Sequence, residues 1–509
     1  MIQRILNTQT KSISFASLIL FGSYLTSAIL GLFRDRLLAG RFGAGDSLDS
    51  YYAAFVVPDF IALILIFGAI SAAIIPIFSS YYIKSKDEAW EYAANLLNIF
   101  LLLLILVSVI LIIFAPFVVS IIAPGFSAEK RVDTVLLMRI MFLSPIILGT
   151  SNVISGILQV FKRFFVTALA PVMYNIGIIL GIIFFVPLFG LMGLAFGVVF
   201  GGLLHLLIQI PSFFNSGFKY KKVFSLKHQG VLKTLKLMIP RSIGLGAGQI
   251  NTIVITSIAS TLTVGSVAVF NLASNLSTMS VNAIAVSLST AVFPAMSLAY
   301  SKEDSSDFEK KFSGALRQIL FLIIPISILI FILRAQIVRV ILGVGNFTWL
   351  DTRLTAACLG IFAMGLLGQA LVLIISKTFY AAHNTRIPAI ASVLTVSLNV
   401  ILSFLFVSLL NAHGLFFNFI QYLLKLQGIE DIRIAGLAIA FSFAAVVEAI
   451  ALLIMIYRKF KKFNINNVLN STYKILVASL VMAIMAFFVR QELIVFRIIE
   501  LQTFLGVFI

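Results

Sequence analysis

Charged side chains lie inside or beside long apolar segments of this chain, where ionised groups are costly unless they meet water or a partner. Arg34 and Asp35 are adjacent at the end of one apolar segment, and Asp59 follows Pro58 inside the next. We expect Arg34 and Asp35 to face an aqueous cavity or each other. A cation held away from bulk water is suited to binding phosphate. Arg34 is therefore the first candidate for an anion-binding residue.

A second cation, Arg241, lies at the start of the seventh predicted span and is the next candidate for contact with an anion. Neutral amide side chains of nearby spans could bind sugar or peptide groups: Gln249, Asn251 and Asn275. Their alternative role is hydrogen bonding between helices, worth about 0.6 kcal/mol on average in membranes. Asp59, and Glu448 in the twelfth predicted span, are the candidates for binding a proton or a monovalent cation.

Motifs of several enzyme classes do not occur in the sequence. There is no GxxxxGK[ST] phosphate loop, no HExxH, and no clustered set of His and Cys ligands. The single cysteine, Cys358, excludes an internal disulfide and a cysteine-based metal site. His205 lies in a predicted span, where we interpret it as a packing residue, with titration in a cavity as the alternative. We predict no enzyme activity, no cofactor and no metal site, and favour transport driven by a gradient or the membrane potential.

The composition is that of a polytopic membrane protein. Of the 509 residues, 61% are hydrophobic and 11% are charged, whereas soluble domains are about 45–50% apolar and about 25% charged. The apolar runs leave room for roughly 12 to 14 spans of about 20 residues, and their continuity predicts helices rather than a barrel. The net charge of +18 is spread over short loops between spans. This distribution follows the positive-inside rule and argues against nucleic-acid binding.

Hydropathy predicts two sets of six spans and a short C-terminal addition. The first twelve spans are expected near 13–34, 51–82, 91–120, 134–160, 164–187, 190–211, 238–262, 266–298, 313–340, 354–381, 387–410 and 434–457. A thirteenth is expected near 473–489, and 493–509 favours a curtailed fourteenth over an interfacial helix. Lys and Arg are about twice as frequent in the loops that share a side with the N-terminus, which predicts a cytoplasmic N-terminus.

An internal repeat divides the chain. Residues 72–90 (AAIIPIFSSYYIKSKDEAW) parallel residues 290–308 (TAVFPAMSLAYSKEDSSDF), and the GLA at 193–195 parallels that at 436–438. Two halves of like orientation place a substrate site at their interface. We predict an all-α fold of two six-helix bundles around a central cavity, with one or two further helices. The predicted parts are 1–211, a basic cytoplasmic linker at 212–237, 238–458 and 459–509.

The basic and polar sequence of the linker at 212–237 is compatible with either an amphipathic helix on the anionic inner leaflet or a plain basic loop. A second long connection, 411–433, has an amphipathic-looking middle (FFNFIQYLLKLQ) and is expected on the outer side. The glycines Gly193, Gly197 and Gly201 recur every fourth residue and predict a packing face in the sixth span.

A set of motifs, taken in order, resembles one known family. They are Arg34-Asp35, Phe42-Gly43-Ala44-Gly45, Pro58, the run from Gly68-Ala69-Ile70-Ser71 to Pro76-Ile77, Ala123-Pro124-Gly125-Phe126, ILQVFKRFFVTALAP at 157–171, GQIN at 248–251 and the segment 291–297. The chain to about Tyr457 is in this way similar to the MurJ (MviN) family of bacterial lipid II flippases. That family belongs to the multidrug/oligosaccharidyl-lipid/polysaccharide exporter superfamily.

The resemblance implies a monomer of the bacterial inner membrane that moves an undecaprenyl-pyrophosphate-linked peptidoglycan precursor to the outer leaflet by alternating access. It implies as partners this lipid-linked substrate, membrane lipids and a monovalent cation or proton. It also implies cavity arginines that meet the diphosphate, and Arg34 alone of that set is present. Ala28, Ala62 and Asn275 stand where the family has arginine, and Phe67 stands where it has an acidic residue.

Three alternatives stay open because of these departures. A flippase for another lipid-linked oligosaccharide would tolerate a less cationic cavity. A drug/cation antiporter of the same superfamily would use Asp59 or Glu448 as a coupling site. A non-transporting scaffold for cell-wall assembly would need no cavity arginines.

Overall fold

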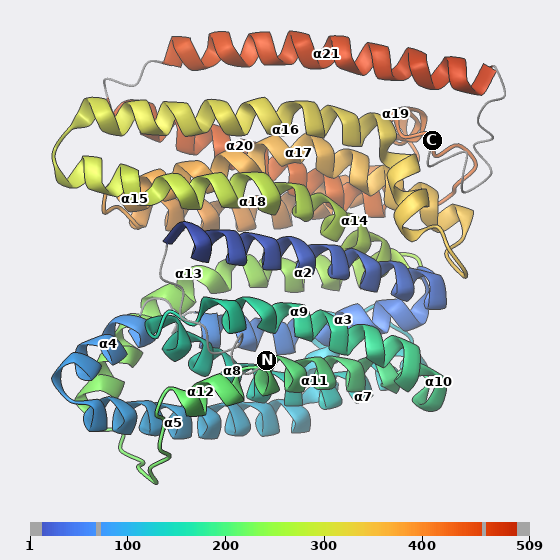
Figure 1. Ribbon diagram of the computed structural model, residues 1–509. Helices are drawn as coiled ribbons and strands as arrows, with labels where there is room; N and C mark the ends of the chain where they lie inside the picture. The colour runs from blue at the N-terminus through green and yellow to red at the C-terminus, as the bar shows by residue number, and fades with distance from the viewer. Residues whose placement is uncertain (1–12, 68–72, 461–464, 496–509) are drawn as a thin grey trace. The chain divides into compact units, whose positions relative to one another are not determined.

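A computed structural model describes residues 13–67, 73–460 and 465–495, and all regular secondary structure in these ranges is helical (Figure 1). Twelve helices of this described part are long and apolar enough to cross a membrane. Large apolar side chains on α5, α18 and α21 are exposed, as expected of faces that meet lipid. These observations confirm the predicted all-α membrane fold. The predicted fourteenth span lies almost wholly outside the described residues.

The helices have the following bounds. In the first half of the chain they are α2 (Ile13–Phe42), α3 (Asp46–Ile61), the π-helix η1 (Ala62–Phe67), α4 (Ile75–Lys84), α5 (Lys86–Ile113), α6 (Ala115–Ile122), α7 (Ala128–Met141), α8 (Leu143–Val160), α9 (Phe164–Leu180), η3 (Gly181–Phe185), α10 (Val186–Phe189), α11 (Met192–Leu207) and α12 (Ile210–Asn215). In the second half they are α13 (Gln229–Ser260), α14 (Ser266–Val281), η4 (Asn282–Val286), α15 (Ser287–Ser301), α16 (Ser305–Leu342), α17 (Trp349–Ala381), α18 (Arg386–Asn411), α19 (Leu415–Leu423), α20 (Ile434–Lys459) and α21 (Ile465–Val495).

Contacts divide the chain into two compact units. The first comprises residues 1–38 and 46–261, and the second comprises 39–45 and 262–509. Helix α13, the seventh predicted span, therefore groups with the first unit, where it packs on η1 and α3. The Ser242 hydroxyl of α13 donates to the Ile64 carbonyl at 2.6 Å. The predicted linker at 212–237 separates the two halves of the sequence repeat. The boundary between the two compact units lies later, at the end of α13.

The repeat recurs in the packing of each unit. In the first unit η1 precedes α4, α4 pairs with α5, and α9 packs on α11. In the second unit η4 precedes α15, α15 pairs with α16, and α18 packs on α20. Helices α16, α17 and α20 run alongside one another in the second unit (Figure 1). The aligned sequence segments thus occupy corresponding places in their own bundles.

Three predicted spans contain a π-helical segment. In the described residues, the span expected at 51–82 comprises α3, η1 and α4, the span expected at 164–187 comprises α9, η3 and α10, and the span expected at 266–298 comprises α14, η4 and α15. A π-helical turn inserts an extra residue into the helical hydrogen-bond pattern and often marks a functional site. Hydropathy did not predict these segments, because all three runs stay apolar through the irregular turns.

The connection between the two halves of the sequence repeat contains a loop at residues 216–228 rather than an amphipathic helix. It is fastened to α5 by side-chain amides. Asn95 Nδ2 donates to the Ser225 carbonyl at 2.9 Å, Ser225 N donates back to Asn95 Oδ1 at 2.8 Å, and Asn98 Nδ2 donates to the Val223 carbonyl at 2.9 Å. The second connection does contain a helix, α19, as its pattern predicted.

Glycines bring α11 against α9 and η3, which agrees with the predicted packing face. A Cβ built on Gly197 would lie 2.9 Å from Gly181 Cα, and one on Gly193 would lie 2.4 Å from the Phe185 carbonyl carbon. These contacts are backbone to backbone, so a side chain cannot be accommodated by rotation. The close approach of the two helices therefore depends on glycine.

We expect Gly193→Ala to lower the stability of the full-length protein by about 1–3 kcal/mol, the usual cost of overpacking. The matched control is Gly202→Ala on the same helix, where a Cβ would meet only side-chain atoms at 3.6 Å. That variant should be neutral or slightly stabilising. Thermal unfolding of the detergent-purified proteins measures both. Equal melting temperatures for the two variants would contradict the packing role of Gly193.

Candidate functional site

The first unit contains a cavity of about 480 Å³ that holds two of the predicted site residues, Arg34 and Asp59. The other described residues that line it come from α3, η1, α8, α9 and α11: Phe55, Ala62, Leu148, Asn152, Ser155, Gln159, Thr167, Pro171, Tyr174 and His205. Hydroxyl, amide and charged groups share the lining with apolar ones. A cavity of this size with a few convergent polar groups is typical of a ligand site.

Arg34 is held in place by two neighbours. Its Nε and Nη2 donate to Asp35 Oδ1 at 3.1 and 2.9 Å, and its Nη1 donates to Asn175 Oδ1 at 3.3 Å. Asn175 is oriented in turn, since its Nδ2 donates to Ser27 Oγ at 3.0 Å. A guanidinium has five N–H donors, so these bonds leave two available among the described contacts. Arg34 can therefore bind an anion while Asp35 and Asn175 fix its orientation.

Asp59 and Gln249, predicted separately, lie together. Gln249 Nε2 of α13 donates to Asp59 Oδ2 of α3 at 3.3 Å. The Asp59 side chain is exposed and lines the cavity, where Phe55 and Leu148 are among its apolar neighbours. A carboxylate that lines a cavity within a membrane bundle, with one neutral donor among the described residues, is suited to exchanging a proton or binding a cation. The contact brings the predicted ion-coupling residue next to a predicted cargo-binding residue.

The remaining predicted residues lie elsewhere. Asn251 is buried and follows Gln249 by two residues in α13. Arg241 is also in α13, but its side chain lies outside the described residues. Asn275 of α14 and Glu448 of α20 both belong to the second unit, where each is half-buried. Glu448 has the Thr395 side chain of α18 as a hydrogen-bonding neighbour.

His205 lies in a buried polar network at one side of the cavity. Ser151 Oγ is 2.7 Å from His205 Nδ1, Gln209 Nε2 donates to Ser151 Oγ at 2.8 Å, and Ser155 Oγ donates to Gln209 Oε1 at 2.6 Å. Each member has a partner inside the bundle, so the network agrees with a packing role for the histidine.

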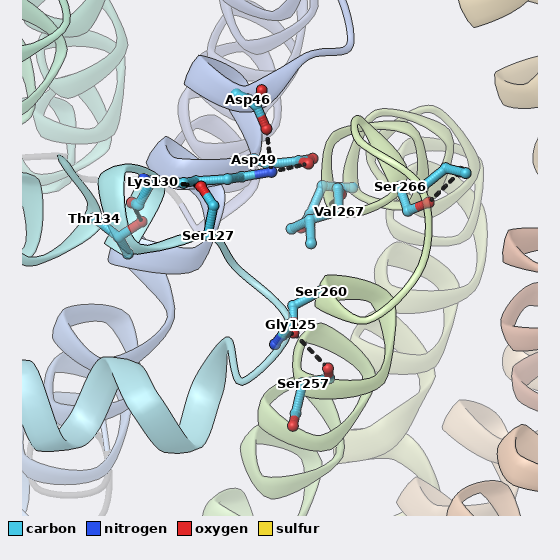
Figure 2. A network of polar contacts seen from close by, with 12 residues as sticks. Asp46, Asp49, Gly125, Ser127, Lys130, Thr134, Ser257, Ser260, Ser266 and Val267 are labelled. Atoms are coloured by element: carbon cyan, nitrogen blue, oxygen red, sulfur yellow. Dashed lines mark hydrogen bonds and ion pairs between the residues drawn. The ribbon is translucent and has the colours of Figure 1, made fainter. Parts of the chain in front are cut away.

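Sequence reasoning missed a buried ion cluster at the start of α7. Figure 2 shows Lys130 reaching to Asp46 and Asp49 of α3, and its Nζ lies 2.8 Å from a carboxylate oxygen of each. Lys130 and Asp49 are buried, and the Phe126 ring lies 4.1 Å from the same Nζ. The acidic residues Asp46 and Asp49 were visible at the start of a span, but their partner is 81 residues away from Asp49.

The Ala-Pro-Gly-Phe motif at 123–126 connects α6 to α7 beside this cluster (Figure 2). The Gly125 N–H donates to Ser260 Oγ at 3.2 Å, and a Cβ on Gly125 would lie 2.2 Å from the Ser260 carbonyl oxygen. Only glycine allows this connection to lie directly on the end of α13. The motif therefore has a packing explanation as well as a family resemblance.

Comparison with known proteins gives consistent results. The family model "Lipid II flippase MurJ" matches residues 38–501. A relative described as a probable lipid II flippase MurJ, from Buchnera aphidicola subsp. Acyrthosiphon pisum, is 32% identical over 74% of each chain.

Two solved structures give the same fold. A lipid II flippase MurJ in an inward closed conformation superposes with a TM-score of 0.77 at 28% identity, covering 92% of this chain and 93% of that one. An inward-facing multidrug resistance transporter of the MATE family superposes with a TM-score of 0.68 at 16% identity, over 88% of this chain and 98% of that one. The second match shows only a shared fold. The family match spans most of the chain, so this protein belongs to the MurJ family of lipid II flippases.

Proposed function

We propose that the chain flips lipid II, an undecaprenyl-pyrophosphate-linked peptidoglycan precursor, from the inner to the outer leaflet of the bacterial inner membrane. The family match over residues 38–501 supports this cargo and the role in cell-wall synthesis. The observation in the structure that supports it best is the Arg34 guanidinium, which lines a 480 Å³ cavity within an apolar bundle. Alternating access is the transport mode that the fold favours.

The departures from the family pattern are compatible with a diphosphate cargo that relies on Arg34 and neutral donors. Ala62, at one of the missing arginine positions, lines the same cavity as Arg34. The cavity is thus less cationic at that point, while Asn152, Gln159 and Thr167 supply amide and hydroxyl groups. Arg241 is proposed as a second cation for the cargo, and Asn251 and Asn275 as amide contacts to its sugar and peptide parts.

Complementation tests this function. A bacterium depleted of its own lipid II flippase should grow when it expresses this chain, and lipid II should become accessible on the outer face. Absence of rescue by a protein that is inserted in the membrane and supports no leaflet exchange of lipid II in proteoliposomes would contradict the proposal. Leaflet exchange of another lipid-linked oligosaccharide in the same vesicles would then identify the alternative cargo.

We also propose that the N-terminus is cytoplasmic, that the protein works as a monomer, and that a proton or monovalent cation drives transport. The basic loops support the orientation. Asp59 is the proposed coupling residue of the first unit, since its carboxylate is open to the cavity and bonded to Gln249. Glu448 is the corresponding proposal for the second unit.

We expect Asp59→Asn to remove most of the stimulation of lipid II flipping by an imposed proton or sodium gradient, because the variant keeps the side chain's size but not its charge. The measurement is lipid II exchange in proteoliposomes with and without the gradient. Glu129→Gln, at an exposed site on α7, is the matched control and should respond like the wild type. A gradient response in Asp59→Asn equal to that of the wild type would exclude Asp59 from coupling.

A further inference from the structure

A second cavity, of about 180 Å³, lies within the second unit where the end of α16 and the start of α17 meet the residues that follow α19. One water needs about 10–15 Å³ of such space, so a small anion with bound water fits. Three of the ten described residues that line the cavity are cationic, and none is acidic: Arg334, Arg353 and Lys425 are the cations.

Backbone carbonyls position the two arginines of this cavity. Arg353 Nη2 donates to the Lys425 carbonyl at 2.6 Å and to the Gln427 carbonyl at 2.9 Å. Arg334 Nη1 donates to the Phe331 carbonyl at 2.7 Å, and its stem packs over Gly360. Among the described residues, the hydrogen bonds of Arg353 all come from Nη2, so its Nε and Nη1 can donate to a ligand. Such fixed donors lose little entropy when an anion binds.

None of the described residues that line this cavity is acidic, so its wall carries positive charge only. A further cation, Arg339, lies 5.9 Å from the ring of Trp349, which forms part of the cavity wall. A cavity lined by one sign of charge attracts the opposite sign. The nearby carboxylate of Asp351 already accepts from Thr348 N at 2.9 Å in a capping box at the start of α17.

A second acidic residue, Asp431, follows the cavity residue Lys425 in the sequence and is paired with another cation. Its Oδ2 lies 2.5 Å from Arg433 Nη2. Burial opposes ionisation of Asp431, but hydrogen bonds from Arg433 outweigh this effect and hold the pKa of the carboxyl below its ordinary value. Its charge is therefore committed to Arg433 rather than to the cations of the cavity.

A neutral group in the cavity wall also lacks a partner. Gln336 Oε1 is buried and accepts no hydrogen bond from any described residue. A buried polar atom without a partner costs about 1–3 kcal/mol. The amide can present either its oxygen or its NH₂ to the cavity, because a half-turn exchanges them. Gln336 can therefore donate to an anion or accept from a water that accompanies it.

We propose that this cavity binds a phosphate group, with Arg334, Arg353 and Lys425 as its cationic contacts and Gln336 as a neutral one. The phosphate can belong to the headgroup of an anionic phospholipid or to a free phosphate ion. On the orientation proposed above, the cavity faces the outer leaflet. Trp349, which lines the cavity and is 60% exposed, suits the lipid source, because tryptophan is enriched at the membrane interface.

The test uses the full-length protein in detergent micelles and measures its melting temperature. Phosphatidylglycerol is compared with dioleoylglycerol, which lacks the phosphate, and sodium phosphate is compared with sodium chloride at equal ionic strength. A ligand that binds only the folded state raises the melting temperature. We expect phosphatidylglycerol to raise it, and the rise to fall by at least half in Lys425→Gln and in Arg353→Gln.

Lys425 is exposed, so Lys425→Gln is expected to fold normally even if Arg353→Gln does not. Arg386→Gln removes an exposed cation of the same unit outside the cavity and should keep the full rise. A rise with sodium phosphate as well would identify a free anion as a second source. An equal rise in Lys425→Gln and wild type, or no rise with either phosphate-bearing probe, would overturn the proposal.

Discussion

Replacing Arg34 by alanine is expected to abolish rescue of a flippase-depleted bacterium and to weaken binding of lipid II by about 10- to 100-fold. A hydrogen bond to a charged group contributes about 1.5–3 kcal/mol, and each 1.4 kcal/mol corresponds to about tenfold in affinity. Arg34 is the one arginine or lysine among the described residues that line the 480 Å³ cavity. Arg34→Lys keeps the positive charge but not the planar guanidinium with its five N–H donors, so we expect an intermediate loss of lipid II affinity.

The design must separate lost binding from lost folding, because Arg34→Ala leaves Asp35, whose side chain is 4% exposed, without this cation. The double variant Arg34→Gln/Asp35→Asn removes both charges and keeps similar volumes. It should fold like the wild type and still fail to bind lipid II. Arg41→Ala, which removes an exposed cation from the same helix, is the matched control and should rescue growth. Binding of lipid II by the double variant at wild-type affinity would exclude Arg34 from the cargo site.

Helices and the repeat could be predicted from sequence because both are local properties of the chain. An apolar run long enough to cross a bilayer must form a helix there, and Pro76 and Pro294 stand at matching places in two such runs. The π-helical breaks at Ala62–Phe67 and Asn282–Val286 could not be predicted in the same way. No change in residue type marks them, and they depend on how each bundle packs.

The candidate site could be predicted in part. Arg34 and Asp59 were conspicuous because a charge in an apolar run needs an explanation, and the structure places both at one cavity. Asn175, which orients Arg34, was missed because it lies 141 residues further on and an asparagine in a span has many possible roles. Such partners follow from tertiary packing, which a single sequence does not display.

The tertiary partners of Lys130 could not be predicted from the sequence either, and the stability of the protein depends on them more strongly. In the sequence it belongs to a polar segment, AEKRVD at 128–133, that looks like an ordinary loop between spans. In the structure its side chain is 8% exposed and lies between two carboxylates, one of them, on Asp49, 2% exposed. The sequence shows charged residues in both segments but nothing that pairs them, because Lys130 lies 81 residues after Asp49.

Lys130→Met is expected to destabilise the protein by about 3–5 kcal/mol, the usual cost of removing one partner of a buried ion pair. Methionine fills a similar volume, but the Asp49 carboxylate then stays buried without its cation. The exposed Asp46, at 62%, contributes little to this cost. Thermal or denaturant unfolding of the purified protein measures the change. The matched control is Lys311→Met, which breaks the partly exposed pair with Asp307 on α16 and should cost about 0–1 kcal/mol.

The double variant Lys130→Met/Asp49→Asn separates the two contacts that Lys130 makes. It removes the uncompensated charge, so most of the lost stability should return if the ion pair is responsible. The alternative is the contact between Lys130 Nζ and the Phe126 ring, 4.1 Å apart, which the double variant does not restore. If the double variant is as unstable as Lys130→Met, the cation–π contact and packing of Lys130 account for the loss. Because Lys130 joins α7 to α3, recovery of stability without recovery of lipid II transport would show that the charge pair is needed while the helices move.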